Sequence, residues 1–350
     1  MPAGAQVCVP ALNLPADILL APLADLLDMQ GVIDWLLEPS QPAVRYLTMR
    51  DLLDSSSGDL KEAQQGLTSE GWVADILGAR KPGGHWVDKE NLYRPKYIST
   101  NWMLLTLSDL GMTKREPRID KSCALWMDRF SRPDGGFDMG DSKRSEHCLT
   151  GNTARALVKF GYADDLKVRS AFELLVKTQK ANGGWHCWGS NGTIDAWEGL
   201  SAFAVYPRQK WTKGMKNSVE RGCEFYLSRE LSKQGAHYEP WFRFHFPYHY
   251  YYDLLLGLEF TTALGYAEDK RLGLAVAHLK KKRRKDGRWN LDAVHPDYDN
   301  NGKLPGWWEE YKGRFHPFAL EKVGQPSKMI TLRALVVLKR LGEFNPRTAT

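Results

Sequence analysis

An aromatic residue that follows a glycine-containing turn recurs along this chain at a nearly constant interval. These residues are Trp86, Phe137, Trp185, Tyr238 and Trp289, and the intervals are 51, 48, 53 and 51 residues. The segments around them read PGGHW, DGGFDMG, NGGWHCW, QGAHY and DGRWN. Each segment follows one helix-like stretch and precedes another. A period of this size is typical of a fold built by repeating one supersecondary unit.

Between these turns, apolar residues recur at three- to four-residue spacing, which predicts helices rather than strands. The expected helices span residues 41–54, 68–80, 96–111, 117–130, 147–161, 165–180, 193–206, 214–231, 247–265, 268–284 and 326–342, and residues 16–37 add one more. Glycines that end helices support these bounds, since Gly111, Gly161, Gly265 and Gly342 each follow an apolar stretch.

The twelve expected helices form six pairs, in which the first helix is the more apolar and the second carries more charge. Helices that are apolar all round belong inside a fold and amphipathic helices outside it. The sequence therefore predicts an all-α fold, an α6/α6 barrel (toroid) of six helical hairpins. The Gly–aromatic turns join each outer helix to the next inner one, and their rings are expected to wedge between repeats.

We expect one domain over residues 1–350, in which residues 1–40 form an N-terminal extension and a closing helix. Residues 290–325 interrupt the repeat without a clear helical pattern, and loops of this length are commonly functional or disordered. Trp307 and Trp308 make the segment too apolar for disorder. We interpret residues 290–325 as an aromatic lid loop over one end of the barrel, against the alternative of a packed structural excursion.

Charge and cysteine content favour an intracellular protein that does not bind nucleic acid. The formal net charge is +6, and its densest part, Lys280 to Lys285, ends an expected helix, where cations are stabilised by the helix dipole. No basic groove with interleaved aromatic residues accompanies this run. The five cysteines show no metal-finger spacing, so reduced thiols in the cytoplasm are expected. No apolar run is long enough to span a membrane, and the oligomeric state stays open.

Parallel inner helices would bring their first turns to one mouth of the ring, where polar residues should converge. Capping explains Thr150, Thr193 and Ser327, but it does not explain histidine, cysteine or tryptophan at the equivalent places. His249 and Asp253 lie four residues apart, which would place them on one helical face. The candidate catalytic residues are Asp195, Glu198, His147, His249, Tyr251 and Cys148. The candidate substrate-binding residues are Trp102, Asn152, Arg155, Trp188, Trp197, Tyr252, Asp253 and Lys328, with Trp307 and Trp308 from the expected lid.

One turn carries a family motif. Residues 179–185, QKANGGW, fit the Q-x-x-x-G-x-W motif of squalene-hopene and oxidosqualene cyclases. With the six hairpins, the chain resembles the terpenoid cyclase/prenyltransferase superfamily of α/α toroids over nearly its whole length. In the place of the D-x-D-D acid of class II cyclases, residues 195–198 keep an acid at the first and fourth positions, Asp195 and Glu198.

The resemblance also bears on metal binding. Protein prenyltransferases hold zinc with a D-x-C pair and a distant histidine, and Asp195 and His249 match the Asp and His by position. Trp197 stands where the thiolate would be, and thiolates are preferred zinc ligands. We therefore expect no cofactor, with zinc at Asp195 and His249 as the alternative.

Three functions remain in competition at this point. The first is an enzyme of cyclase, isomerase or lyase type that acts by acid–base chemistry on a mostly apolar small molecule, a terpenoid or an aromatic. Asp195 or Glu198 would be the acid, with a pKa raised by burial, and His147 and His249 would relay protons. The second is β-elimination on an acidic sugar by His147, Asn152, Arg155 and Tyr251. The third is a toroid that binds a lipid or peptide without catalysis.

Overall fold

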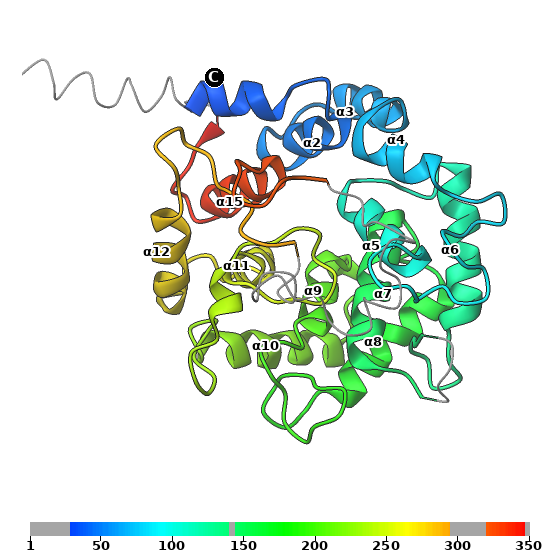
Figure 1. Cartoon of the computed structure of the whole chain (residues 1–350). Helices are drawn as coiled ribbons and strands as arrows, with labels where there is room; N and C mark the ends of the chain where they lie inside the picture. Colours follow the sequence, from blue (N-terminus) through cyan, green and yellow to red (C-terminus); the bar gives the residue numbers. More distant parts are fainter. Residues whose placement is uncertain (1–28, 140–143, 295–319, 347–350) are drawn as a thin grey trace, which may run out of the picture.

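The computed structural model describes residues 29–139, 144–294 and 320–346 and confirms the all-α toroid (Figure 1). After a helix at residues 29–36, the elements are α2 (Pro42–Leu47), η1 (Thr48–Leu52), α3 (Ser57–Gln65), η2 (Gly66–Thr68), α4 (Gly71–Gly78), α5 (Thr100–Asp109), α6 (Pro117–Phe130), α7 (His147–Phe160), α8 (Leu166–Thr178), α9 (Glu198–Val205), η3 (Arg208–Lys210), α10 (Lys213–Leu227), η4 (Glu239–Phe242), α11 (Leu254–Ala263), η5 (Lys270–Leu272), α12 (Gly273–Lys281) and α15 (Lys328–Arg340). Over the described ranges, the backbone forms only isolated β-bridges and no strand.

The helices form an inner and an outer ring. The inner ring consists of α2 with η1, α5, α7, α9, α11 and α15, and consecutive inner helices from α5 to α15 are in contact. Helix α15 also contacts η1 and α2, which brings the two ends of the repeat together. Helices α4, α6, α8, α10 and α12 lie outside this ring (Figure 1). In the four pairs from α5 to α12 the inner helix is the more apolar of the two, as the sequence predicts.

The inner helices run in the same direction, because their carboxyl ends all border one cavity. This cavity of about 230 Å³ is lined by residues of the inner-ring elements, among them Asp51, Asp109, Lys159, Val205, Ala263 and Arg340 near their last turns. We call it the lower cavity. Because the carboxyl ends share one mouth, the first turns of the same helices face the other mouth.

Four of the five Gly–aromatic turns bury their ring, and each of these four makes at least one of two recurring hydrogen bonds. The rings of Trp86, Phe137, Trp185 and Trp289 are at most 1% exposed. Each indole N–H donates to a carbonyl of the preceding outer helix ten residues earlier, on Ile76, Leu175 and Leu279 respectively for the three tryptophans. The backbone N–H of Trp86, Phe137 and Trp289 donates to a threonine hydroxyl on the next inner helix, Thr100, Thr150 and Thr331.

Glycine is needed two residues before each of these rings because the backbone there is left-handed. The φ angles of Gly84, Gly135, Gly183 and Gly287 lie between 76° and 95°, a region in which a Cβ atom is strained. In the fourth turn, Tyr238 departs from the expected wedge, since its ring is 47% exposed. The chain between α10 and α11 is longer than the connections from α4 to α5, from α6 to α7 and from α8 to α9, and Tyr238 packs against Trp241 instead.

Two inner helices begin five or more residues later than the sequence predicts, and α5 begins four residues later, at Thr100. Helix α9 begins at Glu198 rather than near residue 193, and α11 begins at Leu254 rather than near residue 247. Asp253 is the N-cap of α11, because its Oδ1 accepts the N–H of Leu256 at 2.8 Å. His249, with φ of 32°, therefore precedes the helix, and the expectation that His249 and Asp253 share a helical face is wrong.

The segment before α11, residues 244–253, fills the centre of the ring. The Tyr248 ring lies 3.6 Å from the guanidinium carbon of Arg333 and 5.6 Å from that of Arg155, and its hydroxyl donates to Glu259. The His249 ring stacks on the ring of Tyr97, which lies just before α5. The barrel centre is therefore a packed plug contributed by a loop, and the open spaces lie above and below it.

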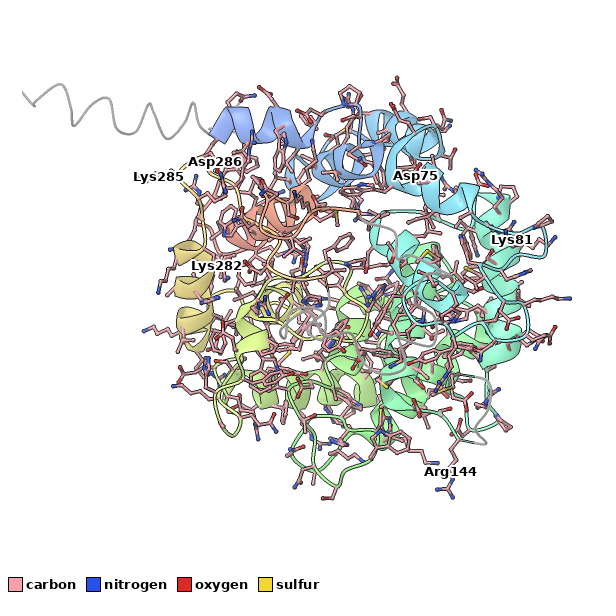
Figure 2. The ribbon with its side chains drawn as sticks, viewed as in Figure 1. Asp75, Lys81, Arg144, Lys282, Lys285 and Asp286 are labelled. Atoms are coloured by element: carbon pink, nitrogen blue, oxygen red, sulfur yellow. The ribbon has the colours of Figure 1, made fainter. Side chains whose placement is uncertain are left out.

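The two ends of the 290–325 segment lie side by side, because Leu291 N–H donates to Gln325 O and Gly324 N–H to Leu291 O. The part that would form the expected lid, including Trp307 and Trp308, lies outside the described residues. The neighbouring basic run lies at the outer edge of the molecule, where Figure 2 labels Lys282 and Lys285. Lys280 pairs with Glu343 and Lys282 with Asp292, so acids offset part of its charge.

Gly151 sets the close approach of α7 to α9. A Cβ atom at this position would lie 2.5 Å from the carbonyl carbon of Glu198. We expect Gly151→Ala to lower the free energy of unfolding by about 1–3 kcal/mol, because the two helices must separate. Gly31→Ala is the control, since a Cβ there meets nothing within 4 Å. Denaturant unfolding of both variants tests this, and a Gly151→Ala protein as stable as the Gly31→Ala protein would contradict it.

Candidate functional site

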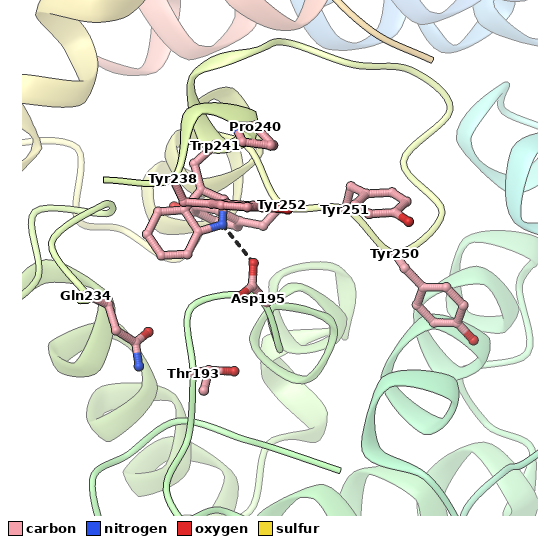
Figure 3. A pocket seen from close by; sticks show the side chains of 9 residues that line it. All are labelled: Thr193, Asp195, Gln234, Tyr238, Pro240, Trp241, Tyr250, Tyr251 and Tyr252. Carbon is pink, nitrogen blue, oxygen red and sulfur yellow. Dashed lines mark hydrogen bonds between the residues drawn. The ribbon is translucent and has the colours of Figure 1, made fainter. Parts of the chain in front are cut away.

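A cavity of about 380 Å³ lies at the mouth formed by the first turns of the inner helices (Figure 3). It is lined by Thr193, Asp195, Gln234, Tyr238, Pro240, Trp241, Tyr250, Tyr251 and Tyr252. These residues come from the segments that precede α9 and α11, the two inner helices that begin late. We call this space the tyrosine-lined cavity. Four tyrosines and a tryptophan give it mainly aromatic walls, and Asp195 is the one acidic residue among the lining residues.

Asp195 is exposed and held in place by an indole. The Nε1–H of Trp241 donates to Asp195 Oδ1 at 2.7 Å, as the dashed line in Figure 3 shows. Because an indole N–H can only donate, this carboxylate oxygen has to accept. Next to it, Gln234 Oε1 accepts the N–H of Ile194 at 2.7 Å and fixes the segment that carries Asp195. The second carboxylate oxygen is left for solvent or a bound molecule.

Glu198 lies three residues beyond Asp195, at the start of α9, but in a different environment. Its side chain is buried, and its Oε2 has no hydrogen-bond partner among the described residues. Burial raises the pKa of Glu198 well above its usual value, and the charges of Cys187 and Asp195 raise it further. The surroundings of Glu198 therefore favour its protonated form, whereas Asp195 faces the cavity and water.

The cavity tyrosines are anchored from behind. Tyr252 donates its hydroxyl to Leu231 O at 2.8 Å, and Tyr250 is hydrogen-bonded through its hydroxyl to Tyr93. The indole of Trp197 donates to Tyr250 O at 3.1 Å. Trp102 packs edge-on against Tyr250 with ring centroids 5.3 Å apart. Trp102 and Trp197 are thus buried supports of the cavity wall rather than lining residues.

His249 and Asn152 belong to the plug below the cavity. His249 is 6% exposed, and its Nε2 lies 3.3 Å from the hydroxyl of Thr106. Asn152 Nδ2 donates to His249 O at 2.6 Å. Burial, and then the neighbouring His245, lower the pKa of His249 to about 3. The imidazole is therefore neutral at physiological pH.

Asp253 pairs with a different histidine from the one that its sequence position suggests. His245 Nδ1 lies 2.6 Å from Asp253 Oδ2, and the backbone N–H of His245 donates to the same oxygen at 2.9 Å. Both side chains are buried. Together with the cap bond to α11, these contacts use both carboxylate oxygens, so Asp253 fixes the plug segment onto the helix.

Arg155 and Lys328 lie away from the tyrosine-lined cavity. Arg155 borders the lower cavity, where it and Lys159 bind Asp109 at 2.7 Å each. Lys328 reaches outward from α15 to Glu38 at 2.7 Å. Both cations therefore join elements of the barrel, and neither faces Asp195.

His147, Cys148 and Trp188 lie beside the cavity rather than in it. His147 Nδ1 is 3.2 Å from the hydroxyl of Thr178 at the end of α8, and burial lowers the pKa of His147 to about 4. Cys148 contacts Cys187. Trp188 is 83% exposed, so its ring faces solvent, and it is not among the lining residues.

Across residues 29–139, 144–294 and 320–346, no three His, Cys, Asp or Glu side chains lie close enough together to hold a metal ion. Asp195 bonds to Trp241 and His249 to Thr106, so the pair considered for zinc is divided between the cavity and the plug. Within the same ranges, no helix is long and apolar enough to cross a membrane.

Sequence reasoning brought Asp195, Tyr251 and Tyr252 to the cavity but missed Gln234, Tyr238, Trp241 and Tyr250 among its lining residues. Tyr250 belongs to residues 242–255, FRFHFPYHYYYDLL, which are rich in aromatic residues and histidine. If this segment were a helix, its consecutive tyrosines could not all face the same way. Because this block is a loop, Tyr250, Tyr251 and Tyr252 all line the cavity. Recognising Asp253 as the N-cap of α11 would have placed the preceding tyrosines in a loop.

The fold and the site define an α/α toroid with an acidic, tyrosine-lined cavity. No protein-family model and no curated protein sequence matches the chain. The solved structures similar to it include the type II terpene cyclase MstE from Scytonema in complex with geranylgeranyl dihydroxybenzoate, at 17% identity, a TM-score of 0.44, and coverage of 93% of this chain and 99% of that chain.

The structure of MstE without ligand is similar at 14% identity and a TM-score of 0.47, over 92% of this chain and 99% of that one. A polysaccharide lyase is similar at 12% identity and a TM-score of 0.48, over 92% and 97% of the two chains. At such identities, the chemistry of the cavity has to be argued from the residues of this chain.

Proposed function

We propose that this protein is an enzyme that performs acid–base chemistry on a mostly apolar small molecule, a terpenoid or an aromatic, in the tyrosine-lined cavity. The observation that carries the proposal is the pairing of two carboxyl groups in unlike surroundings. Asp195 is exposed at the cavity and Glu198 is buried with a raised pKa. Pairs of acids whose environments differ in this way commonly divide the roles of base and acid.

The walls of the cavity support an apolar substrate. A volume of about 380 Å³ is within the range of small-molecule sites. The faces of Tyr238, Trp241, Tyr250 and Tyr251 offer apolar area, and aromatic faces also stabilise developing positive charge. Such charge arises when an alkene or an alcohol is protonated. The substrate class therefore follows from the walls, and the reaction class from the acids.

In the proposed reaction, Glu198 supplies a proton and Asp195 removes one. Tyr250 lines the cavity and lies within electrostatic range of Glu198, which gives the buried proton a route toward the bound molecule. Protonation at one carbon and deprotonation at another would cyclise or isomerise the substrate. Protonation of a hydroxyl followed by loss of water and a proton would eliminate. Neither sequence requires an oxidant or a reductant.

The other two functions fit the contacts less well. β-Elimination on an acidic sugar needs cations free to pair with a carboxylate, and Arg155 is engaged by Asp109. His147 faces Thr178, and Asn152 binds the plug, so the residues considered for this chemistry do not share a cavity with Tyr251. A binding protein without catalysis would use the same walls, and the experiment below separates it from an enzyme.

The proposal is tested by incubating the full chain with prenyl alcohols and prenylated phenols and analysing products by mass spectrometry. We expect an isomer of unchanged mass or a product that has lost water. Recovery of unchanged probe that co-migrates with the protein in native mass spectrometry would identify a binding protein instead. Growth of ultraviolet absorbance on uronate polymers, without change of the prenyl probes, would identify a lyase.

A further inference from the structure

Two cysteines from different repeats meet beside the tyrosine-lined cavity. Cys148 is in the first turn of α7, and Cys187 follows the Trp185 turn. Their Sγ atoms are 3.2 Å apart, and the backbone N–H of Cys148 donates to Cys187 Sγ at 3.5 Å. Both residues are partly exposed, whereas Cys123 and Cys223 are buried. The pair was invisible to spacing rules because it joins residues from two consecutive repeats.

The two sulfurs need a small movement to bond. A disulfide holds its sulfurs at about 2.05 Å, so the present separation must shorten by little more than 1 Å, on the order of a bond length. Cys148 is fixed by the helix, but Cys187 lies in the segment 186–197, which has no regular helix. The required movement can therefore come from the Cys187 side of the pair.

The electrostatic surroundings give the two thiols different roles. The hydrogen bond with Cys148, and then the backbone N–H groups of Cys148 and His147, lower the pKa of Cys187 to about 7 against the opposing effect of burial. The pKa of Cys148 is raised by the hydrogen bond with Cys187 and by burial. A thiolate is the reactive form of cysteine. Cys187 is therefore the attacking sulfur and Cys148 the resolving one.

We propose that Cys148 and Cys187 form a redox-active dithiol that a peroxide converts into an intramolecular disulfide. The Cys187 thiolate attacks one peroxide oxygen, the O–O bond breaks, and a sulfenic acid and hydroxide form. The Cys148 sulfur then attacks the sulfenic sulfur and displaces the second hydroxide. The two thiol protons convert the hydroxides into water, so hydrogen peroxide is reduced by two electrons and the dithiol is oxidised by two. A thiol reductant reverses the change by exchange.

This inference does not depend on the proposed function, although oxidation would change the electrostatic surroundings of two residues of the site. Cys148 lies within electrostatic range of Glu198 and Tyr250. Disulfide formation removes its thiol from that neighbourhood. The dithiol chemistry is measured on the protein itself, so its outcome is separate from any test of turnover.

The test treats the reduced full chain with a small excess of hydrogen peroxide. We expect two of the five thiols to disappear, the intact mass to fall by two hydrogen atoms, and peptide mapping to join Cys148 to Cys187. Alkylation of Cys187 by iodoacetamide should reach half its maximal rate near pH 7, against about 8.5 for a free cysteine thiol. All of these measurements use the unaltered protein, so they do not depend on whether a variant folds.

Variants separate the two roles. In Cys148→Ser, oxidation should stop at a sulfenic acid on Cys187, which dimedone captures. Cys187→Ser should abolish the rapid reaction with hydrogen peroxide. Cys123→Ser and Cys223→Ser are matched controls that should keep disulfide formation, since burial raises the pKa of both thiols. A linkage between other cysteines, or an alkylation midpoint of Cys187 at that of a free thiol, would overturn the proposal.

Discussion

Asp195→Asn is expected to lower kcat on the prenyl probe that the protein converts by about 100-fold or more. The amide keeps an oxygen that can accept the Trp241 Nε1–H bond of 2.7 Å, so the fold of the cavity should persist. It cannot take up a proton from the substrate, because an amide is not a base at neutral pH. The measurement is single-turnover product formation, with KM expected to change little.

Two further variants sharpen this result. Asp75→Asn is the matched control, since Asp75, labelled in Figure 2, is exposed on the outer helix α4 and is not among the residues that line the cavity. Glu198→Gln should also lower kcat and should remove the loss of activity that sets in as pH rises through the raised pKa of Glu198. Unchanged turnover in Asp195→Asn would end the assignment of Asp195 as the base.

His249 should make the protein less stable as pH falls. The folded-state pKa of His249 is about 3 and lies below the value of 6.5 for an ordinary histidine, so the unfolded chain binds the proton more tightly. The stabilising contribution is complete above about pH 6.5 and is lost progressively toward pH 3. At pH 4 the loss from this one buried group is about 3 kcal/mol. His245, Asp109 and Arg155 are the charged neighbours that modify it.

The measurement is the free energy of unfolding at pH 7 and pH 4 for the unaltered protein and for His249→Gln. The difference between the two pH values should be about 3 kcal/mol smaller in His249→Gln, whatever the variant does to stability at pH 7. His237→Gln is the control, because His237 is 65% exposed and should leave the difference unchanged. An equal pH dependence in His249→Gln and the unaltered protein would show that His249 is not buried in the plug.

The repeat was predictable from sequence because its determinants are local. The indole of Trp86, Trp185 or Trp289 reaches a carbonyl ten residues earlier, and the left-handed glycine stands two residues before the ring. Such short-range requirements produce a recognisable pattern in the amino-acid sequence. The apolar character of the inner helices left a second pattern, and together they specify the toroid.

The plug was not predictable in the same way. Residues 247–253 carry apolar side chains at a spacing that a helix would also show, and Asp253 caps α11 instead of continuing a helix. The partners of this segment, Arg333 on α15 and Trp102 on α5, come from repeats that are far apart in the sequence. Periodicity describes one element at a time, so it could not place a loop inside the ring.

The same limit explains the mixed outcome for the site. Asp195 and Tyr251 lie where parallel helices should bring them, since they precede first turns at the same mouth. Arg155 lies on α7 as expected but two turns in, where Asp109 binds it. Lys328 begins an inner helix yet points outward, toward Glu38. Position along a helix was inferable, whereas the direction of each side chain depended on partners in other repeats.

Photolabelling tests the central claim most directly, namely that a small apolar molecule binds among the aromatic residues at the mouth formed by the leading ends of the inner helices. A prenylated phenol that carries a diazirine would be irradiated with the full chain and the labelled peptides sequenced. The account predicts label on residues 193–195, 238–241 and 250–252, reduced by an excess of the unlabelled phenol. Label confined to the lower cavity, around Asp109 and Arg333, or scattered over the outer helices, would contradict it.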